Sequence, residues 1–184
     1  IAALSERDHL RRLLERVVDA LLLWTGVERG LLLLRAGDRL VPRAARNLAR
    51  ADLRGEQIAL SYTLAQRALE ALEPVVAVDA TGELSSVHTS VHALKLRSVL
   101  AVPLIARGEA LGVVYLDDRV RRGAFGPREL AWTRAVASIA ALAIADARAQ
   151  VLLTRAARRA QRAKAKLEET LARNEAALDI AERE

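Results

Sequence analysis

The sequence predicts an α+β fold, in which an antiparallel sheet carries helices on both faces and a long C-terminal helix follows. Apolar residues recur at helical spacing near both ends of the chain, and two pairs of short apolar runs are each separated by turn residues. No proline or glycine occurs after Pro127, which favours one continuous helix to the end. Helices combined with hairpins are typical of a sheet that buries its faces under helices.

The composition limits the kinds of site that the chain can hold. It has 184 residues, of which 52% are hydrophobic, enough for one well-buried domain and an appendage. Cysteine is absent, which excludes disulfides, cysteine nucleophiles and thiolate metal sites. The absence of cysteine also fits a reducing cytoplasm, where we expect the protein. No apolar run approaches the roughly 18–20 residues that span a bilayer, so we expect no membrane contact. The chain begins with Ile1, and we expect it to be part of a longer protein.

The N-terminal quarter of the chain predicts a helix and a hairpin. Ser5 has the spacing of a capping-box residue, and leucine and valine follow at helical intervals to about Trp24. Gly26 is a stop signal for that helix. Two apolar runs, 30–35 and 39–45, then flank a Gly-Asp turn and predict a hairpin.

The middle of the chain predicts a second helix, a strand and a second hairpin. Residues 47–60 are interpreted as a connecting segment, and 61–72 as an amphipathic helix. Residues 74–79 predict a short buried strand, because a proline biases the chain away from helix and apolar residues follow. Residues 80–96 are polar and predict a loop with a short helix, and 97–119 predict the second hairpin.

Two features of the 97–119 hairpin lead to further expectations. Pro103 removes a backbone donor from an apparently central strand, so we expect a bulge or a locally unpaired edge there. Asp117 and Asp118 could form an acid–base pair, but adjacent strand residues point to opposite faces. We therefore expect Asp117 to end the strand and bond local backbone, and Asp118 to lie in the exit turn.

The segment 127–184 predicts one long helix, with Pro127 at its first position. Its early part suits packing on the sheet, and its later part repeats leucine and alanine at seven-residue intervals. Lys164 and Asn174 weaken this coiled-coil pattern, so the helix needs a partner, and we expect a homodimer through the terminal helices. The residues expected at the dimer contact are Leu142, Leu153, Ala160, Leu167, Leu171 and Leu178.

The net charge of +6 arises mainly from one stretch of this helix. Between Ala147 and Leu167 there are seven Arg or Lys residues and no acid, and acids dominate from Glu168 onward. Aromatic residues make up 3% of the chain, too few for base stacking, so direct nucleic-acid binding is not expected. The basic run is interpreted as the solvated flank of a coiled coil, with DNA phosphates as the alternative. Parallel and antiparallel pairing both remain open.

Three segments of the chain together resemble the GAF domain, a regulatory and small-molecule-sensing family. These segments are Glu73-Pro-Val-Val-Ala-Val-Asp-Ala80, Arg97-Ser-Val-Leu-Ala-Val-Pro-Leu104 and Leu111-Gly-Val-Val-Tyr-Leu-Asp117. The resemblance covers about Leu4 to Arg148 and is greatest to GAF domains of sigma-54-dependent transcription activators, histidine kinases and nucleotide cyclases. It implies a domain at 1–148 and a helical coiled-coil linker at 149–184. A PAS-like fold is the alternative.

The resemblance implies a sensory or regulatory module without catalysis. Such a module binds a small ligand or partner and signals through a dimeric helical linker to a C-terminal output domain, in transcription regulation or phosphorelay signalling. Bilin attachment and methionine sulfoxide reduction both use cysteine in this family, so neither is expected here, and no cofactor is expected. The residue set for cyclic-nucleotide binding is not traceable. A ligand-free structural dimerisation domain is the alternative.

The resemblance places a ligand pocket on one sheet face, under the helix at 61–72 and the segment at 80–97. The residues expected to line it are Asp79, His88, Ser90, Val91, Leu94, Arg97, Ser98 and Tyr115. Arg97 could pair with an anionic ligand, and Tyr115 could be either core or a platform for a ligand. His88 and His92 are four residues apart, but no nearby acids complete a metal site, so no metal is expected.

Overall fold

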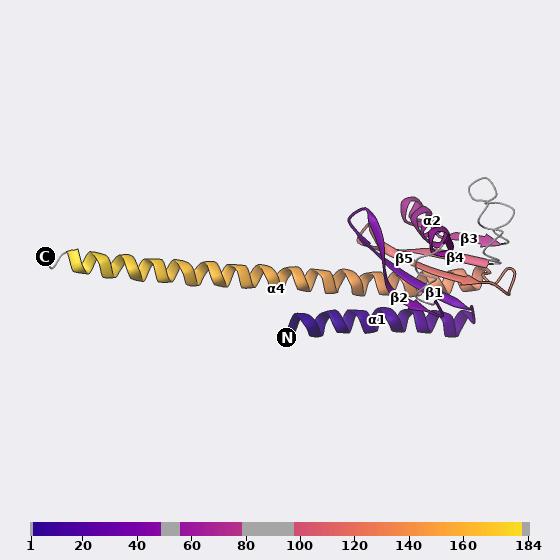
Figure 1. Ribbon diagram of the computed structural model, residues 1–184, viewed down its shortest axis with the longest axis horizontal. Coiled ribbons are helices and arrows are strands. Elements are labelled where there is room, and N and C mark those ends of the chain that lie inside the picture. The colour runs from indigo at the N-terminus through magenta and orange to yellow at the C-terminus, as the bar shows by residue number, and fades with distance from the viewer. Residues whose placement is uncertain (1, 49–55, 79–97, 182–184) are drawn as a thin grey trace. The chain divides into compact units, whose positions relative to one another are not determined.

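The α+β prediction is confirmed by the computed structural model, which describes residues 2–48, 56–78 and 98–181, with side chains over 8–48, 62–78 and 98–174 (Figure 1). The elements are α1 (Ala2–Thr25), β1 (Arg29–Ala36), β2 (Arg39–Arg46), α2 (Glu56–Ala71), β3 (Val75–Val78), β4 (Ser98–Ala106), β5 (Glu109–Asp118) and α4 (Pro127–Ala181).

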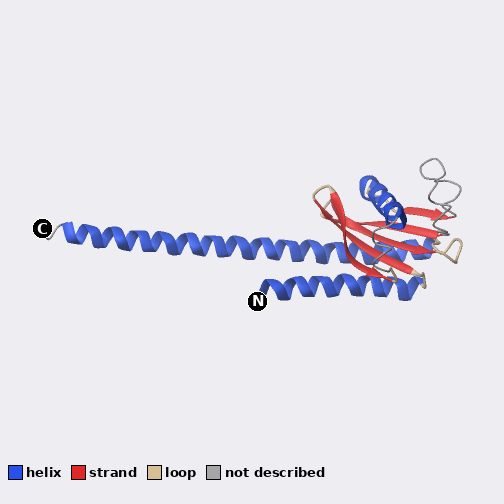
Figure 2. Ribbon diagram, in the orientation of Figure 1, coloured by secondary structure: helices blue, strands red, loops and turns tan. Residues whose placement is uncertain are grey.

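The described strands form one sheet in the order β2-β1-β5-β4-β3, and every neighbouring pair is antiparallel (Figure 2). Alternate residues of each strand enter two separate cores, because side chains of a strand alternate between its faces. Leu32 and Leu34 of β1 pack with α1 and the first part of α4, whereas Leu31 and Leu33 pack with α2. Helices therefore cover both faces of the sheet, as predicted.

The first helix begins earlier than predicted. α1 already includes Ala2, so Ser5 lies inside the helix and does not begin it. The helix ends at Thr25, next to the stop signal that the sequence predicts at Gly26. Gly26 has a φ of 63°, a conformation that glycine adopts without strain, and its amide donates to the carbonyl of Leu22 at 2.8 Å.

Two predictions for the middle of the chain were wrong in detail. α2 begins at Glu56, inside the segment interpreted as a connector, because Glu56–Leu60 are good helix formers that continue the turns of the amphipathic part. β3 is an edge strand rather than a buried one. Ala77 is buried, but Val76 and Val78 are exposed, because the short strand pairs on one side only.

Pro103 is accommodated as the sequence predicts. β4 pairs with β3 only as far as Ala101, so Pro103 has no partner on β3. A register shift follows between Leu104 and Ile105. On the neighbouring strand, a Cβ at Gly112 would collide with the carbonyl oxygen of Leu33, so this position requires glycine.

The chain divides into two compact units, Ile1–Ala145 and Asp146–Glu184, and α4 contributes to both. The sequence analysis placed the domain boundary after residue 148. Within the first unit, Ala137, Ala140 and Ile144 of α4 are buried in the sheet core. An 18-residue window of the helix is apolar enough to cross a membrane by length and composition, and 22% of it is buried.

Candidate functional site

The structure describes two of the residues that were expected to line a ligand pocket, Ser98 and Tyr115. The other expected pocket residues lie outside the described residues. They are Asp79, His88, Ser90, Val91, Leu94 and Arg97, and His92 lies outside them too.

Ser98 and Tyr115 are not brought together. Tyr115 is buried among apolar residues on the sheet face that α2 covers. Ser98 is equally buried but lies in the strand row that faces α1 and α4. Its hydroxyl donates to the carbonyl of Arg121 at 2.8 Å and accepts from the amide of Ala124 at 3.0 Å. The structure thus gives Ser98 a role in holding the loop between β5 and α4.

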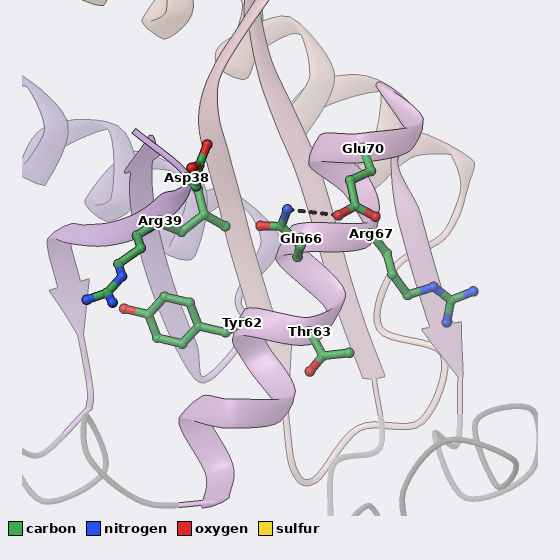
Figure 3. Close-up of a pocket in the computed structure, with 8 residues that line it drawn as sticks. Asp38, Arg39, Tyr62, Thr63, Gln66, Arg67 and Glu70 are labelled. Carbon is green, nitrogen blue, oxygen red and sulfur yellow. Dashed lines mark hydrogen bonds between the residues drawn. The ribbon is translucent and has the colours of Figure 1, made fainter. Parts of the chain in front are cut away.

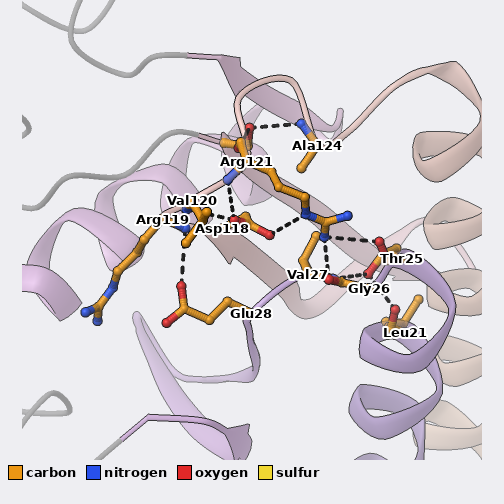
Figure 4. A network of polar contacts seen from close by, with 11 residues as sticks. Leu21, Thr25, Gly26, Val27, Glu28, Asp118, Arg119, Val120, Arg121 and Ala124 are labelled. Atoms are coloured by element: carbon orange, nitrogen blue, oxygen red, sulfur yellow. Dashed lines mark hydrogen bonds and ion pairs between the residues drawn. The ribbon is translucent and has the colours of Figure 1, made fainter.

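Asp118 fixes the same loop through its carboxylate (Figure 4). One oxygen accepts from the amides of Val120 at 2.8 Å and Arg121 at 2.7 Å, and the other accepts from Nε of Arg121 at 2.9 Å. Burial opposes ionisation of Asp118, but these hydrogen bonds and the Arg121 charge outweigh it and lower the pKa of Asp118 below its ordinary value. The local backbone role that the sequence gave to Asp117 therefore belongs to Asp118.

Asp117 has a distant partner instead, so the expectation of local bonding was wrong. Its Oδ1 accepts from Nε of Arg29 at 2.7 Å, and the two residues are direct neighbours in the register of β1 and β5. Both side chains are buried, with exposed fractions of 1% and 3%. Burial raises the pKa of Asp117, and the Arg29 guanidinium offsets part of that rise. Asp117 and Asp118 each serve a different partner and do not form a pair.

Arg121 connects this loop to the end of the first helix. Its Nη2 donates to the carbonyl oxygens of Thr25 at 3.3 Å and of Gly26 (Figure 4). A cation at the C-terminal end of a helix satisfies free carbonyls and complements the helix dipole. The loop continues through Gly126, whose amide donates to Glu129 at 3.0 Å at the start of α4. Hydrogen bonds therefore link the start of β4 with both terminal helices.

A groove lies between α2 and the turn that joins β1 to β2, and we call it the α2 groove (Figure 3). It has a volume of about 610 Å³, and a neighbouring hollow of about 340 Å³ shares part of its wall. The residues that line the groove are Asp38, Arg39, Leu40, Tyr62, Thr63, Gln66, Arg67 and Glu70.

The α2 wall of this groove is a polar row beside the apolar row that packs on the sheet. Tyr62, Gln66 and Glu70 follow at four-residue spacing, and Nε2 of Gln66 donates to Glu70 at 2.9 Å. Burial raises the pKa of Tyr62, so it remains a neutral phenol near pH 7. Sequence reasoning missed this site. The four-residue polar row was the available signal, but it does not show that a hairpin turn lies opposite.

The comparisons with known proteins agree with this architecture. The sequence pattern described as GAF domain matches residues 9–144. The chain belongs to the GAF domain family. Members of this family are, in general, sensory and regulatory signalling domains. No curated protein matches the chain.

Solved structures show the same GAF fold at low sequence identity. A GAF domain/HD domain protein from Geobacter sulfurreducens is 18% identical with a TM-score of 0.62, over 76% of this chain and 94% of that chain. A domain of a two-component sensor histidine kinase from Sinorhizobium meliloti is 18% identical with a TM-score of 0.60, over 76% and 93%. A type II free methionine-R-sulfoxide reductase from Thermoplasma acidophilum is 15% identical with a TM-score of 0.61, over 74% and 92%.

Proposed function

We propose that this chain is a non-catalytic sensory or regulatory GAF module that binds a small ligand or partner. Two copies associate through their terminal helices and pass the signal to a C-terminal output domain. The observation that carries the proposal is an apolar row on the outward side of α4, which leaves a helix with two apolar sides.

Within the first unit, the outward row is formed by Trp132, Ile139 and Leu142. Trp132 also packs on Trp24 of α1, with 5.0 Å between the ring centroids, so Ile139 and Leu142 are the members without such a contact among the described rings. The three side chains of the row are 48%, 69% and 52% exposed, while Ala140 and Ile144 on the other side of the helix are buried in the core. A surface helix normally has one apolar stripe, which faces its own core. A second stripe on the opposite side exposes large apolar groups in one row, which is typical of a surface that contacts a partner.

The second unit has the same character. Leu153, Leu167 and Leu171 are 70%, 60% and 52% exposed, and Ala160 is exposed too. The side chain of Leu178 lies outside the described residues. Leucine and alanine at seven-residue spacing match the seam of a coiled coil, and a second copy of the chain offers an identical seam. These positions remain our proposed dimer contacts.

The loop between β5 and α4 supports the transmission part of the proposal. Ser98 begins β4 and holds this loop, and Arg121 of the loop holds the end of α1. A shift at the start of β4 would therefore reach the two helices that we expect to meet the second copy. The solved structures that are similar to this chain include a two-component sensor histidine kinase domain and a methyl-accepting chemotaxis protein. We propose that this chain likewise serves phosphorelay signalling or transcription regulation.

The second candidate function is a structural dimerisation domain that binds no ligand. It is favoured by Tyr115, which is 2% exposed and fills the sheet face under α2 together with Ala101 and Val113. In this function the outward row on α4 would serve association alone.

Native mass spectrometry of the chain as purified separates these functions. The sensory function is expected to give the mass of two chains plus a small molecule that is lost on collisional activation. A dimer without added mass, which gains none from a metabolite extract, would favour the structural function. A monomer at tens of micromolar would contradict both.

A further inference from the structure

We propose that the α2 groove binds a zwitterionic small molecule of the α-amino acid class, with an apolar or aromatic side chain. The inference deepens the proposed function, because it names a ligand class and a place for the ligand. The groove shares the helix at 61–72 with the pocket that the resemblance implies, but its opposite wall is the β1–β2 turn.

The position of α2 on the sheet creates the groove. α2 lies against β3, β4 and β5, so the β1–β2 hairpin rises beside the helix instead of passing beneath it. Leu64, Ala65 and Ala68 bury the lower side of the helix against the sheet. The groove volume of about 610 Å³ is within the range of roughly 300–1,000 Å³ that is common for small-molecule sites.

Charges of both signs lie on the walls. Asp38 and Arg39 come from the hairpin, and Glu70 comes from α2 (Figure 3). Arg67 of α2 also lines the groove, but its guanidinium points away from Arg39 and Tyr62. Arg39 and Tyr62 point to the same side of the groove, whereas Asp38 and Glu70 lie toward its other end. Among the described residues, Arg39, Asp38 and Glu70 form no ion pair, so these charges remain available to a ligand.

The floor of the groove is apolar. Leu40 lines the main groove and Leu69 lines the neighbouring hollow, and each is 8% exposed. The half-buried ring of Tyr62 adds an aromatic surface beside Leu40, and rings pack well on such a surface. An apolar or aromatic side chain of a ligand therefore has a place between its charged groups.

The combination of charges selects the ligand class. A simple anion would pair with Arg39 but would meet the carboxylates of Asp38 and Glu70. A simple cation would pair with Asp38 or Glu70 but would be repelled by Arg39. A zwitterion places a carboxylate against the guanidinium, as arginine prefers, and an ammonium group against the two carboxylates. Arg35 lines the neighbouring hollow rather than the groove, and its Nε donates to the carbonyl of Gly37 at 3.1 Å.

Three related ligands test the proposal in an NMR titration of the full chain. L-Phenylalanine has both charges, 3-phenylpropionate has only the carboxylate, and phenethylamine has only the ammonium group. We expect phenylalanine to shift the side-chain amide of Gln66 and the backbone amides of Asp38 and Arg39. Its dissociation constant should be lower than that of each singly charged analogue by about fivefold or more, since each lost contact is a partly exposed charge pair.

Two variants assign the charges, and a third is the control. Arg39→Gln should remove the advantage of phenylalanine over phenethylamine, and Glu70→Gln should remove its advantage over 3-phenylpropionate. Arg43→Gln changes an exposed arginine of β2 outside the groove and should leave all three affinities unchanged.

The proposal is overturned if phenylalanine shifts no groove amide, if a singly charged analogue binds equally well, or if Arg43→Gln acts like Arg39→Gln. Both tested side chains are exposed, so loss of the fold does not explain a loss of binding. The mass of the dimer is measured independently. A dimer that does not bind phenylalanine would reject this ligand class and leave the proposed association standing.

Discussion

The guanidinium of Arg29 and the carboxylate of Asp117 form a buried ion pair across β1 and β5, with 2.7 Å between Nε and Oδ1. The two residues are direct partners in the strand register, and their side chains are almost fully excluded from solvent. Each charge is costly to bury alone, so the pair is expected to matter most when one member is missing.

Arg29→Met is expected to lower the free energy of unfolding by about 3–5 kcal/mol, because the buried Asp117 carboxylate loses its counter-charge. The double variant Arg29→Met with Asp117→Leu should regain most of this loss, since it removes both charges. Urea unfolding of the single and double variants measures the difference. A double variant that is less stable than Arg29→Met would show that the pair is not the main contribution of these residues.

Asp118 should make stability depend on acidity. Its pKa is lower in the folded chain than the ordinary value of 3.8, so the unfolded chain binds the proton more tightly. Its contribution is therefore complete above pH 3.8 and is lost as the pH falls through the folded pKa. At pH 7, Asp118→Asn should be about 1–3 kcal/mol less stable than the natural chain, and thermal unfolding should show that gap narrowing below about pH 4. A gap that widens toward pH 3 would contradict this assignment.

Ser98→Ala tests whether Ser98 serves the loop. The change leaves the Ala124 amide and the Arg121 carbonyl without a buried partner, so we expect a loss of about 1–3 kcal/mol in the free energy of unfolding. Ser138→Ala is the matched control, because this exposed serine donates only within its own helix. Its effect should stay within about 0.5 kcal/mol. Equal effects of the two substitutions in denaturant titrations would speak against the loop role.

The layers of the fold were predictable because they follow from periodicity. The continuous apolar run of β1 and the seven-residue spacing in α4 depend only on which residues are apolar, and the structure confirms both elements. The start of α2 was missed, because helix propensity over Glu56–Leu60 is not accompanied by a clear apolar row. Tertiary packing extends the helix where the pattern alone is silent.

The candidate site was less predictable, because its residues meet through distant contacts. Asp117 pairs with Arg29, which lies 88 positions earlier, and no local pattern marks that pair. Ser98 faces a loop 23 residues later rather than the face of Tyr115. The α2 groove forms where a hairpin turn lies opposite a helix. The two elements are separated in the sequence, so no local pattern shows that they face each other. Strand registers and helix positions, rather than motifs, decide these contacts.

The central claim is that two copies of the chain meet along α4, through the outward row and through the seven-residue row that contains Leu153. Leu153 and Leu152 are neighbours of the same residue type and are 70% and 65% exposed, but only Leu153 lies in the seven-residue row. Leu153→Lys should place a charge in the contact and raise the dimer dissociation constant by about tenfold or more. Leu152→Lys should place the same charge outside it.

Sedimentation velocity of the natural chain and the two lysine variants, over a range of concentrations, tests this claim most directly. The account predicts that the natural chain and Leu152→Lys sediment as dimers at tens of micromolar, while Leu153→Lys shifts toward monomer. A natural chain that stays monomeric at this concentration, or two variants that dissociate equally, would contradict it.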